Sequence, residues 1–92
     1  MPFTLVWTAS FTRTDRKFLA RRRDLVGAFS LVLHKLERNP YGPELRLHPL
    51  SGRLAGKQAV SLTYSYRIVL RLEIVESEII LHDVGFHDEV YR

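Results

Sequence analysis

The 92-residue sequence contains no cysteine, which excludes disulfide bonds and thiolate-ligated metal sites. It also lacks any apolar run close to the roughly 18 residues of a membrane span. The opening MPFTLVW has no basic segment before its apolar residues and no small-residue cleavage pattern after them, so it does not predict secretion. No repeat, low-complexity tract or interdomain linker is visible either. These absences predict one soluble domain over residues 1–92, with a cytoplasmic location and no membrane partner.

The positive charge is mostly arginine. The net charge is +4, and eleven of the fourteen basic residues are arginines. The planar guanidinium suits two-point contacts with phosphate, so this composition favours a polyanionic partner such as RNA. An acidic protein partner would satisfy the same positive field, and composition leaves both open.

The first half of the chain predicts a strand followed by two helices. Alternating Phe3, Leu5 and Trp7 indicate a half-buried strand, and Thr8 or Ser10 can cap the helix that follows. A longer helix is expected from about residue 24 until the proline at position 40 ends it. Its apolar stripe consists of Leu25, Phe29, Val32 and Leu36.

The second half predicts a loop and then an antiparallel meander. Residues 40–57 contain three prolines and three glycines, which indicates loop with a short extended piece at 44–48. The expected strands are QAVSLT (58–63), YRIVLRLE (66–73) and IILHDVG (79–85). The order of elements predicts an α+β domain in which a helical hairpin packs on one face of a mostly antiparallel sheet.

Side-chain alternation assigns the residues of the middle strand of this meander to two opposite faces. The side expected to pack on the helices consists of Tyr66, Ile68, Leu70 and Leu72. The open side consists of Arg67, Val69, Arg71 and Glu73. Arg67 and Arg71 are roughly 13 Å apart on an extended chain, so each would serve a different phosphate. Alternatively, Arg67 pairs with an acid on a neighbouring strand.

Two histidines are candidates for proton transfer, because the ordinary pKa of imidazole lies near neutrality. His87 follows Gly85, a residue that permits a bend, and Tyr91 lies one helical turn further on. His48 lies just before a proline in the loop. The structural alternatives are a solvated strand-end histidine and a loop histidine bonded to the backbone.

Other basic and acidic residues are candidates for phosphate or metal binding. Arg46, Arg53 and Lys57 lie in a loop that can drape over the open face of the sheet and donate to phosphate. The pattern His82-Asp83, three residues, His87-Asp88 invites a metal site. Alternation is expected to put His82 and Asp83 on opposite faces, so we predict no metal and no other cofactor.

Three segments of the sequence resemble the RelE/ParE superfamily of type II toxin–antitoxin toxins. They are LSGRLAG, YRIVLRLE and the terminal HDVGFHDEVY, and the resemblance extends over essentially the whole chain. His48-Pro49-Leu50 and His87 make the YafQ-like branch of messenger-RNA interferases the most similar subgroup. The resemblance implies a RelE-like fold and a cognate antitoxin. It also implies metal-independent cleavage of messenger RNA in the ribosomal A site, which inhibits translation.

The resemblance also implies roles for particular residues. Arg67 matches the arginine that holds the phosphate, His87 and His48 match proton-transfer residues, and Tyr91 matches the aromatic that positions RNA. Other residues expected to contact RNA are Arg46, Arg53, Lys57, Tyr66 and Arg71.

Some positions depart from the family. Ser61, Ser65 and Asp83 stand where the YafQ-like branch has histidine, aspartate and arginine, and Gln58 and Val60 replace the RelE lysine pair. We therefore expect a reorganised nuclease site. The alternatives are a ParE-like inhibitor of DNA gyrase and a catalytically silent protein that binds an antitoxin.

Overall fold

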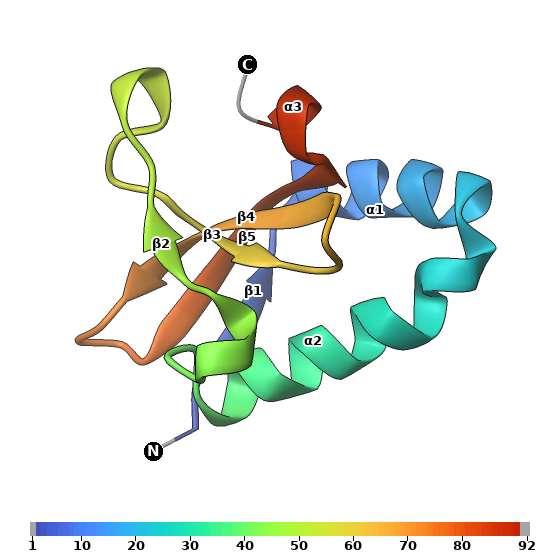
Figure 1. Ribbon diagram of the computed structural model, residues 1–92. Coiled ribbons are helices and arrows are strands. Elements are labelled where there is room, and N and C mark those ends of the chain that lie inside the picture. Colours follow the sequence, from blue (N-terminus) through green and yellow to red (C-terminus); the bar gives the residue numbers. More distant parts are fainter. Residues whose placement is uncertain (1, 91–92) are drawn as a thin grey trace.

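The computed structural model describes residues 2–90, with the side chains at positions 88 and 89 excepted, and shows a sheet flanked by helices (Figure 1). The strands are β1 (Thr4–Trp7), β2 (His48–Pro49), β3 (Gln58–Ser61), β4 (Tyr66–Glu73) and β5 (Glu78–Phe86). The helices are α1 (Ala9–Arg21), α2 (Val26–Arg38) and the short α3 (His87–Val90). Three 3₁₀ turns are η1 (Arg23–Leu25), η2 (Pro43–Leu45) and η3 (Gly52–Leu54).

Thr8 starts α1 and also ties it to the sheet. Its hydroxyl oxygen accepts a hydrogen bond from the Phe11 backbone N–H at 3.1 Å, which confirms the predicted N-cap. The same hydroxyl donates to the Leu81 carbonyl in β5 at 2.9 Å. One side chain therefore sets both where the helix begins and where it rests on the sheet.

The second helix begins two residues later than expected, because Arg23–Leu25 forms the 3₁₀ turn η1. Its predicted stripe is confirmed, since Leu25, Phe29, Val32 and Leu36 are all buried. The helix ends at Arg38, before the proline, as expected.

The five strands form one sheet in the order β1-β5-β4-β3-β2. Strand β1 is parallel to β5, and every other neighbouring pair is antiparallel. The predicted α+β class and meander are thus confirmed. The expected extended piece at 44–48 was wrong over most of its length. Pro43 favours a helical first turn, and η2 forms there, so that only His48 of this piece lies in a strand.

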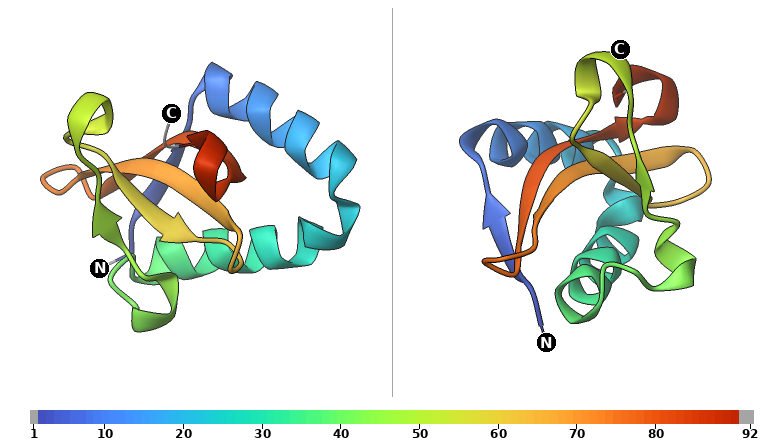
Figure 2. Two further views of the ribbon diagram at one scale, coloured as in Figure 1. Left: turned by 45° about the horizontal axis from the view of Figure 1, so that its top comes forward. Right: turned by 90° about the vertical axis from the view of Figure 1, so that its left-hand side faces the viewer.

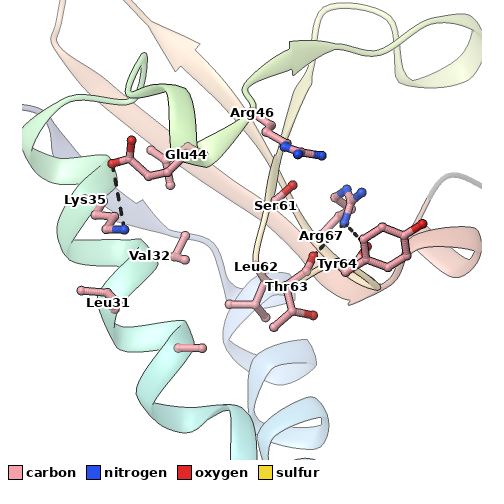
Figure 3. Close-up of a pocket in the computed structure, with 12 residues that line it drawn as sticks. Leu31, Val32, Lys35, Glu44, Arg46, Ser61, Leu62, Thr63, Tyr64 and Arg67 are labelled. Carbon is pink, nitrogen blue, oxygen red and sulfur yellow. Dashed lines mark hydrogen bonds and ion pairs between the residues drawn. The ribbon is translucent and has the colours of Figure 1, made fainter.

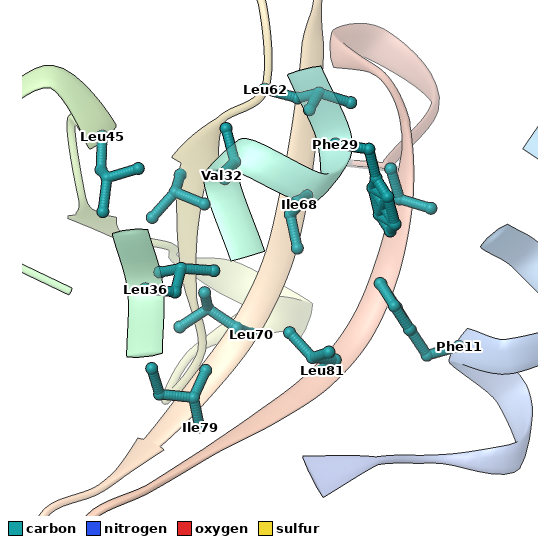
Figure 4. Close-up of a cluster of buried hydrophobic side chains, with 12 residues drawn as sticks. Phe11, Phe29, Val32, Leu36, Leu45, Leu62, Ile68, Leu70, Ile79 and Leu81 are labelled. Carbon is teal, nitrogen blue, oxygen red and sulfur yellow. The ribbon is translucent and has the colours of Figure 1, made fainter. Parts of the chain in front are cut away.

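The main core lies between the sheet and the helical hairpin (Figure 4). Phe11 of α1 and Phe29 of α2 stack with ring centroids 6.1 Å apart. Ile68 and Leu70 of β4 are fully buried in this cluster, and Tyr66 and Leu72 pack against it. The predicted inward face of β4 is therefore confirmed.

The opposite side of the sheet, here called the outer face, carries Arg67, Val69 and Arg71 of β4. In Figures 1 and 2 the β2–β3 loop and α3 lie on one side of the sheet and α2 on the other. Ala59, Val69 and Val90 are buried although they lie outside the main cluster. Because α3 contacts β4 and β5, the outer face is open only in part. No helix within residues 2–90 is long and apolar enough to cross a membrane.

Candidate active site

A β-bulge in β5 decides which side chains reach the outer face. Leu70 pairs with Leu81, but the next residue, Val69, pairs with Asp83, so His82 is an extra residue in β5. Leu81 before the bulge and Val84 after it both belong to the main core. His82 and Asp83 between them therefore lie on the outer face. The prediction that they point to opposite faces was wrong, because strict alternation does not survive an inserted residue.

Strand pairing brings residues distant in sequence into rows across the outer face, since directly opposed partners share a face. One row joins His48, Ala59, Val69 and Asp83. The next joins Ser61, Arg67 and Gly85. The backbones of His48 and Arg67 are therefore two strands apart and two residues offset, a separation of about 12 Å.

Backbone carbonyls hold the Arg67 side chain over the β3–β4 turn. Its Nη1 donates hydrogen bonds to the carbonyl oxygens of Thr63 at 2.9 Å, Tyr64 at 2.9 Å and Tyr66 at 3.1 Å. Among the side chains that the structure describes, no carboxylate forms a salt bridge with this guanidinium, in contrast to the expected alternative of a neighbouring-strand acid. Carbonyls orient the cation without neutralising it, so the site keeps a positive charge.

A second arginine reaches the same place. A hollow of about 360 Å³ lies between α2, η2 and the β3–β4 turn, and Arg46 and Arg67 both line it. Figure 3 shows their side chains extending toward each other beside Ser61. Arg46 has a left-handed backbone (φ 53°) where η2 ends, which redirects the chain toward β2. Two guanidiniums at one hollow supply donors of the kind that suit a phosphate, although Glu44 lines the same hollow.

The hydrogen bond of His48 fixes which ring nitrogen can act as a base. His48 Nδ1 lies 2.9 Å from the Arg46 carbonyl oxygen. A carbonyl can only accept, so Nδ1 carries the proton, and in the neutral ring the lone pair lies on Nε2. The alternative expected from the sequence, in which His48 is hydrogen-bonded to the backbone, is therefore what the structure shows. Such a bond also orients a general base, so it is compatible with catalysis.

The other proton-transfer candidate lies where β5 meets α3. His87 follows Gly85 by two residues, and Gly85 is the direct partner of Arg67. The His87 backbone N–H donates to the Ser65 carbonyl at 2.8 Å, which anchors the start of α3 to the same turn that holds Arg67. The fourth predicted catalytic residue, Tyr91, lies outside the described residues.

The residues expected to contact RNA divide between different places. Arg71 forms a salt bridge with Glu73 on its own strand, and Arg53 is exposed in η3. Lys57 immediately precedes β3. Tyr66 lies on the helix-covered side, where its ring packs edge-to-face on Phe18 and Phe86. The structure thus brings Arg46 to the Arg67 hollow and separates Tyr66 from it.

The bulge also buries an imidazole nitrogen. His82 Nε2 is inaccessible and has no hydrogen-bond partner among the described residues. Burial lowers the pKa of His82, and the positive charges of Lys57 and Arg71 lower it further. No group of three His, Asp or Glu side chains among those described is placed to hold a metal ion.

The depressed pKa of His82 predicts a pH dependence of stability. In the unfolded chain His82 takes up a proton near pH 6.5, whereas in the folded chain its pKa is lower, so it takes up the proton only at a lower pH. The His82 contribution is therefore present above pH 6.5 and is lost as the pH falls toward the lower folded pKa. We expect the His82→Gln variant to lose less stability than the wild type between pH 7.5 and 5.5 in urea unfolding. Equal losses in the two proteins would contradict this assignment.

One contact at the edge of the site was missed from the sequence. The Arg22 guanidinium lies 5.0 Å from the centre of the Tyr66 ring. It also donates to the Tyr66 hydroxyl and pairs with Asp24. The two partners are 44 residues apart, and no local pattern signals such a contact.

No protein-family model matches the chain, and no curated protein matches its sequence. Among solved structures, the YoeB/ParE toxin from Agrobacterium tumefaciens is 26% identical, with a TM-score of 0.74 over 92% of this chain and 99% of that one. The RelBE2 toxin–antitoxin complex from Mycobacterium tuberculosis is 25% identical, with a TM-score of 0.70 over 95% and 100%.

A third match is the E. coli DinJ-YafQ toxin–antitoxin complex. It has 14% identity and a TM-score of 0.78 over 100% of both chains, a likeness of fold alone. The RelE-like fold expected from the sequence is thus confirmed, as is the resemblance to RelE/ParE toxins that include YafQ.

Proposed function

Because the chain has the RelE/ParE toxin fold, we propose that it is the toxin of a type II toxin–antitoxin pair and that it cleaves messenger RNA in the ribosomal A site. One observation carries the choice of RNA cleavage. Arg46 and Arg67 converge on one hollow, and the carbonyl of the same Arg46 orients His48. A base and two cations are the groups that phosphodiester cleavage by a ribose hydroxyl needs.

The proposed reaction is attack of a ribose 2'-oxygen on the adjacent phosphorus. His48 Nε2 removes the 2'-OH proton as the bond from that oxygen to phosphorus forms. Arg67 and Arg46 stabilise the negative charge that builds up on the phosphoryl oxygens. His87 donates a proton to the 5'-oxygen as its bond to phosphorus breaks. The products are a 2',3'-cyclic phosphate and a 5'-hydroxyl, and the chain's own residues suffice for each proton transfer.

Three further residues have supporting places in this proposal. Tyr91 would position the nucleotide, and Arg53 and Lys57 in the β2–β3 loop would contact neighbouring phosphates. Arg71 contributes less because Glu73 already balances its charge. The proposed partners are the translating ribosome and a cognate antitoxin, since two of the similar structures are toxin–antitoxin complexes. The proposed location is the cytoplasm, where ribosomes translate.

Expression and cleavage together test this proposal. We expect induction of the wild-type chain to arrest growth, and the purified protein to cut a defined messenger RNA on programmed ribosomes, leaving 2',3'-cyclic phosphate ends. A DNA-supercoiling assay with gyrase provides the contrast, because a ParE-like toxin would inhibit it. Growth arrest with gyrase inhibition and intact RNA would overturn the nuclease assignment. Absence of growth arrest would instead favour a silent antitoxin-binding protein.

A further inference from the structure

A second hollow lies on the opposite side of the β4–β5 end from Arg67. It has a volume of about 360 Å³ and is formed between α1 and the end of β5. The side chains that matter here are Lys17, Arg21, Arg22, Phe18, Tyr66 and Phe86. Neither the sequence motifs nor the proposed cleavage chemistry uses the three cations of this set.

Aromatic rings make one wall of this hollow. Phe18 and Phe86 each pack edge-to-face against Tyr66, with centroid distances of 5.1 Å and 5.6 Å. The Arg22 guanidinium covers Tyr66, but Phe86 remains 40% exposed. Phe86 therefore offers an accessible ring, and its neighbours hold that ring in place.

Of the three cations at the rim, Arg22 has partners within the protein, whereas Lys17 and Arg21 point to solvent. Arg22 is balanced by Asp24, with a distance of 2.8 Å from Nη2 to Oδ2, and it also donates to the Tyr66 hydroxyl. Lys17 and Arg21 are exposed on α1, and neither forms a salt bridge with any side chain that the structure describes. A ligand that suits this hollow has a flat apolar part for Phe86 and a negative group for Lys17 and Arg21.

We propose that this hollow binds one nucleotide of single-stranded RNA, with its base stacked on Phe86 and its phosphate held by Lys17 and Arg21. The position of the hollow supports an RNA ligand. Tyr66 pairs with Phe86, and the adjacent pair in the same ladder is Arg67 with Gly85. A strand of RNA crossing the end of β4 and β5 can therefore contact the hollow on one face and Arg67 on the other. The proposal rests on the proposed function only in naming RNA as the ligand.

Binding of a single-stranded RNA that cannot be cleaved tests this proposal separately from catalysis. The probe is a fluorescently labelled oligonucleotide of about ten 2'-O-methyl nucleotides, which lacks the attacking hydroxyl, and the readout is fluorescence anisotropy at several salt concentrations. The Arg21→Glu variant should weaken binding about tenfold and reduce the salt dependence by about one counterion. Arg16→Glu is the matched control, because it makes the same charge change at an exposed α1 position outside the hollow.

A second variant examines stacking without a change of charge. Phe86→Leu keeps an apolar side chain but removes the ring, and it should weaken binding about tenfold with an unchanged salt dependence. Thermal unfolding of each variant verifies that the fold is retained. Equal losses in Arg21→Glu and Arg16→Glu, or unchanged affinity in Phe86→Leu, would overturn the proposal. Unchanged RNA binding with loss of antitoxin binding would instead assign the hollow to a protein partner. If RNA binds here but is never cleaved, only the nuclease proposal fails.

Discussion

Replacing His48 by alanine should lower the rate of messenger-RNA cleavage by about 10²- to 10⁴-fold, the usual contribution of a general base. The bond from Nδ1 to the Arg46 carbonyl leaves Nε2 as the basic nitrogen, and alanine offers no group that can remove the 2'-OH proton. The measurement is single-turnover cleavage on programmed ribosomes, with saturating toxin so that weaker binding does not lower the rate.

The matched control for this variant is His34→Ala. His34 lies on α2 with 73% of its side chain exposed, and its recorded partner is Glu37 on the same helix. We expect its cleavage rate to equal that of the wild type. If His48→Ala lowers the rate less than about tenfold while His87→Ala abolishes cleavage, the base is not His48 and the roles proposed for the two histidines are wrong.

Replacing Arg67 by alanine should lower the same rate by about 10²- to 10³-fold, as loss of a positioned group that stabilises transition-state charge does. The three carbonyl bonds hold the guanidinium at the hollow before the substrate arrives, so little reorganisation opposes its action. Lysine at this position retains the charge but cannot make the same fork of hydrogen bonds, so Arg67→Lys should recover the rate only in part.

Arg71→Ala provides the control for Arg67. Both arginines lie on the outer face of β4, but Arg71 is balanced by Glu73. We expect Arg71→Ala to lower the rate less than about tenfold, with circular dichroism and thermal unfolding showing that both variants fold. Similar losses in the two variants would mean that general positive charge on the outer face matters, and that the Arg67 hollow has no special role.

Much of the fold follows from local patterns. The stripe of Phe29, Val32 and Leu36 predicts the buried face of α2 because a helix repeats every 3.6 residues. Alternation in β4 likewise predicts that Ile68 and Leu70 face away from the outer face, because side chains along a strand point to the same face at every second residue. The cap at Thr8 is also local, since its partner is three residues away.

Single residues of the candidate site could also be predicted from the sequence, because each belongs to one strand or one loop. His48 and Arg67 were singled out because their side-chain chemistry suits RNA cleavage and because they occupy motif positions similar to those of RelE/ParE toxins. Their proposed catalytic roles stay predictions until cleavage is measured. What the structure adds is the approach of Arg46 to Arg67 beside Ser61.

The error at His82 and the omission of Arg22 arose because the place of each residue depends on another part of the chain. His82 and Asp83 share a face only because β5 has one more residue than β4 between Leu81 and Val84, and no count along one strand detects that. The stacking of Arg22 on Tyr66 likewise joins the residue that follows α1 to β4. Local periodicity was enough to determine the two long helices, the meander strands and their buried faces, because each depends on neighbours within a few residues. Only the tertiary structure decided which cations meet at each hollow, because strand register and helix docking are set by packing over the whole domain.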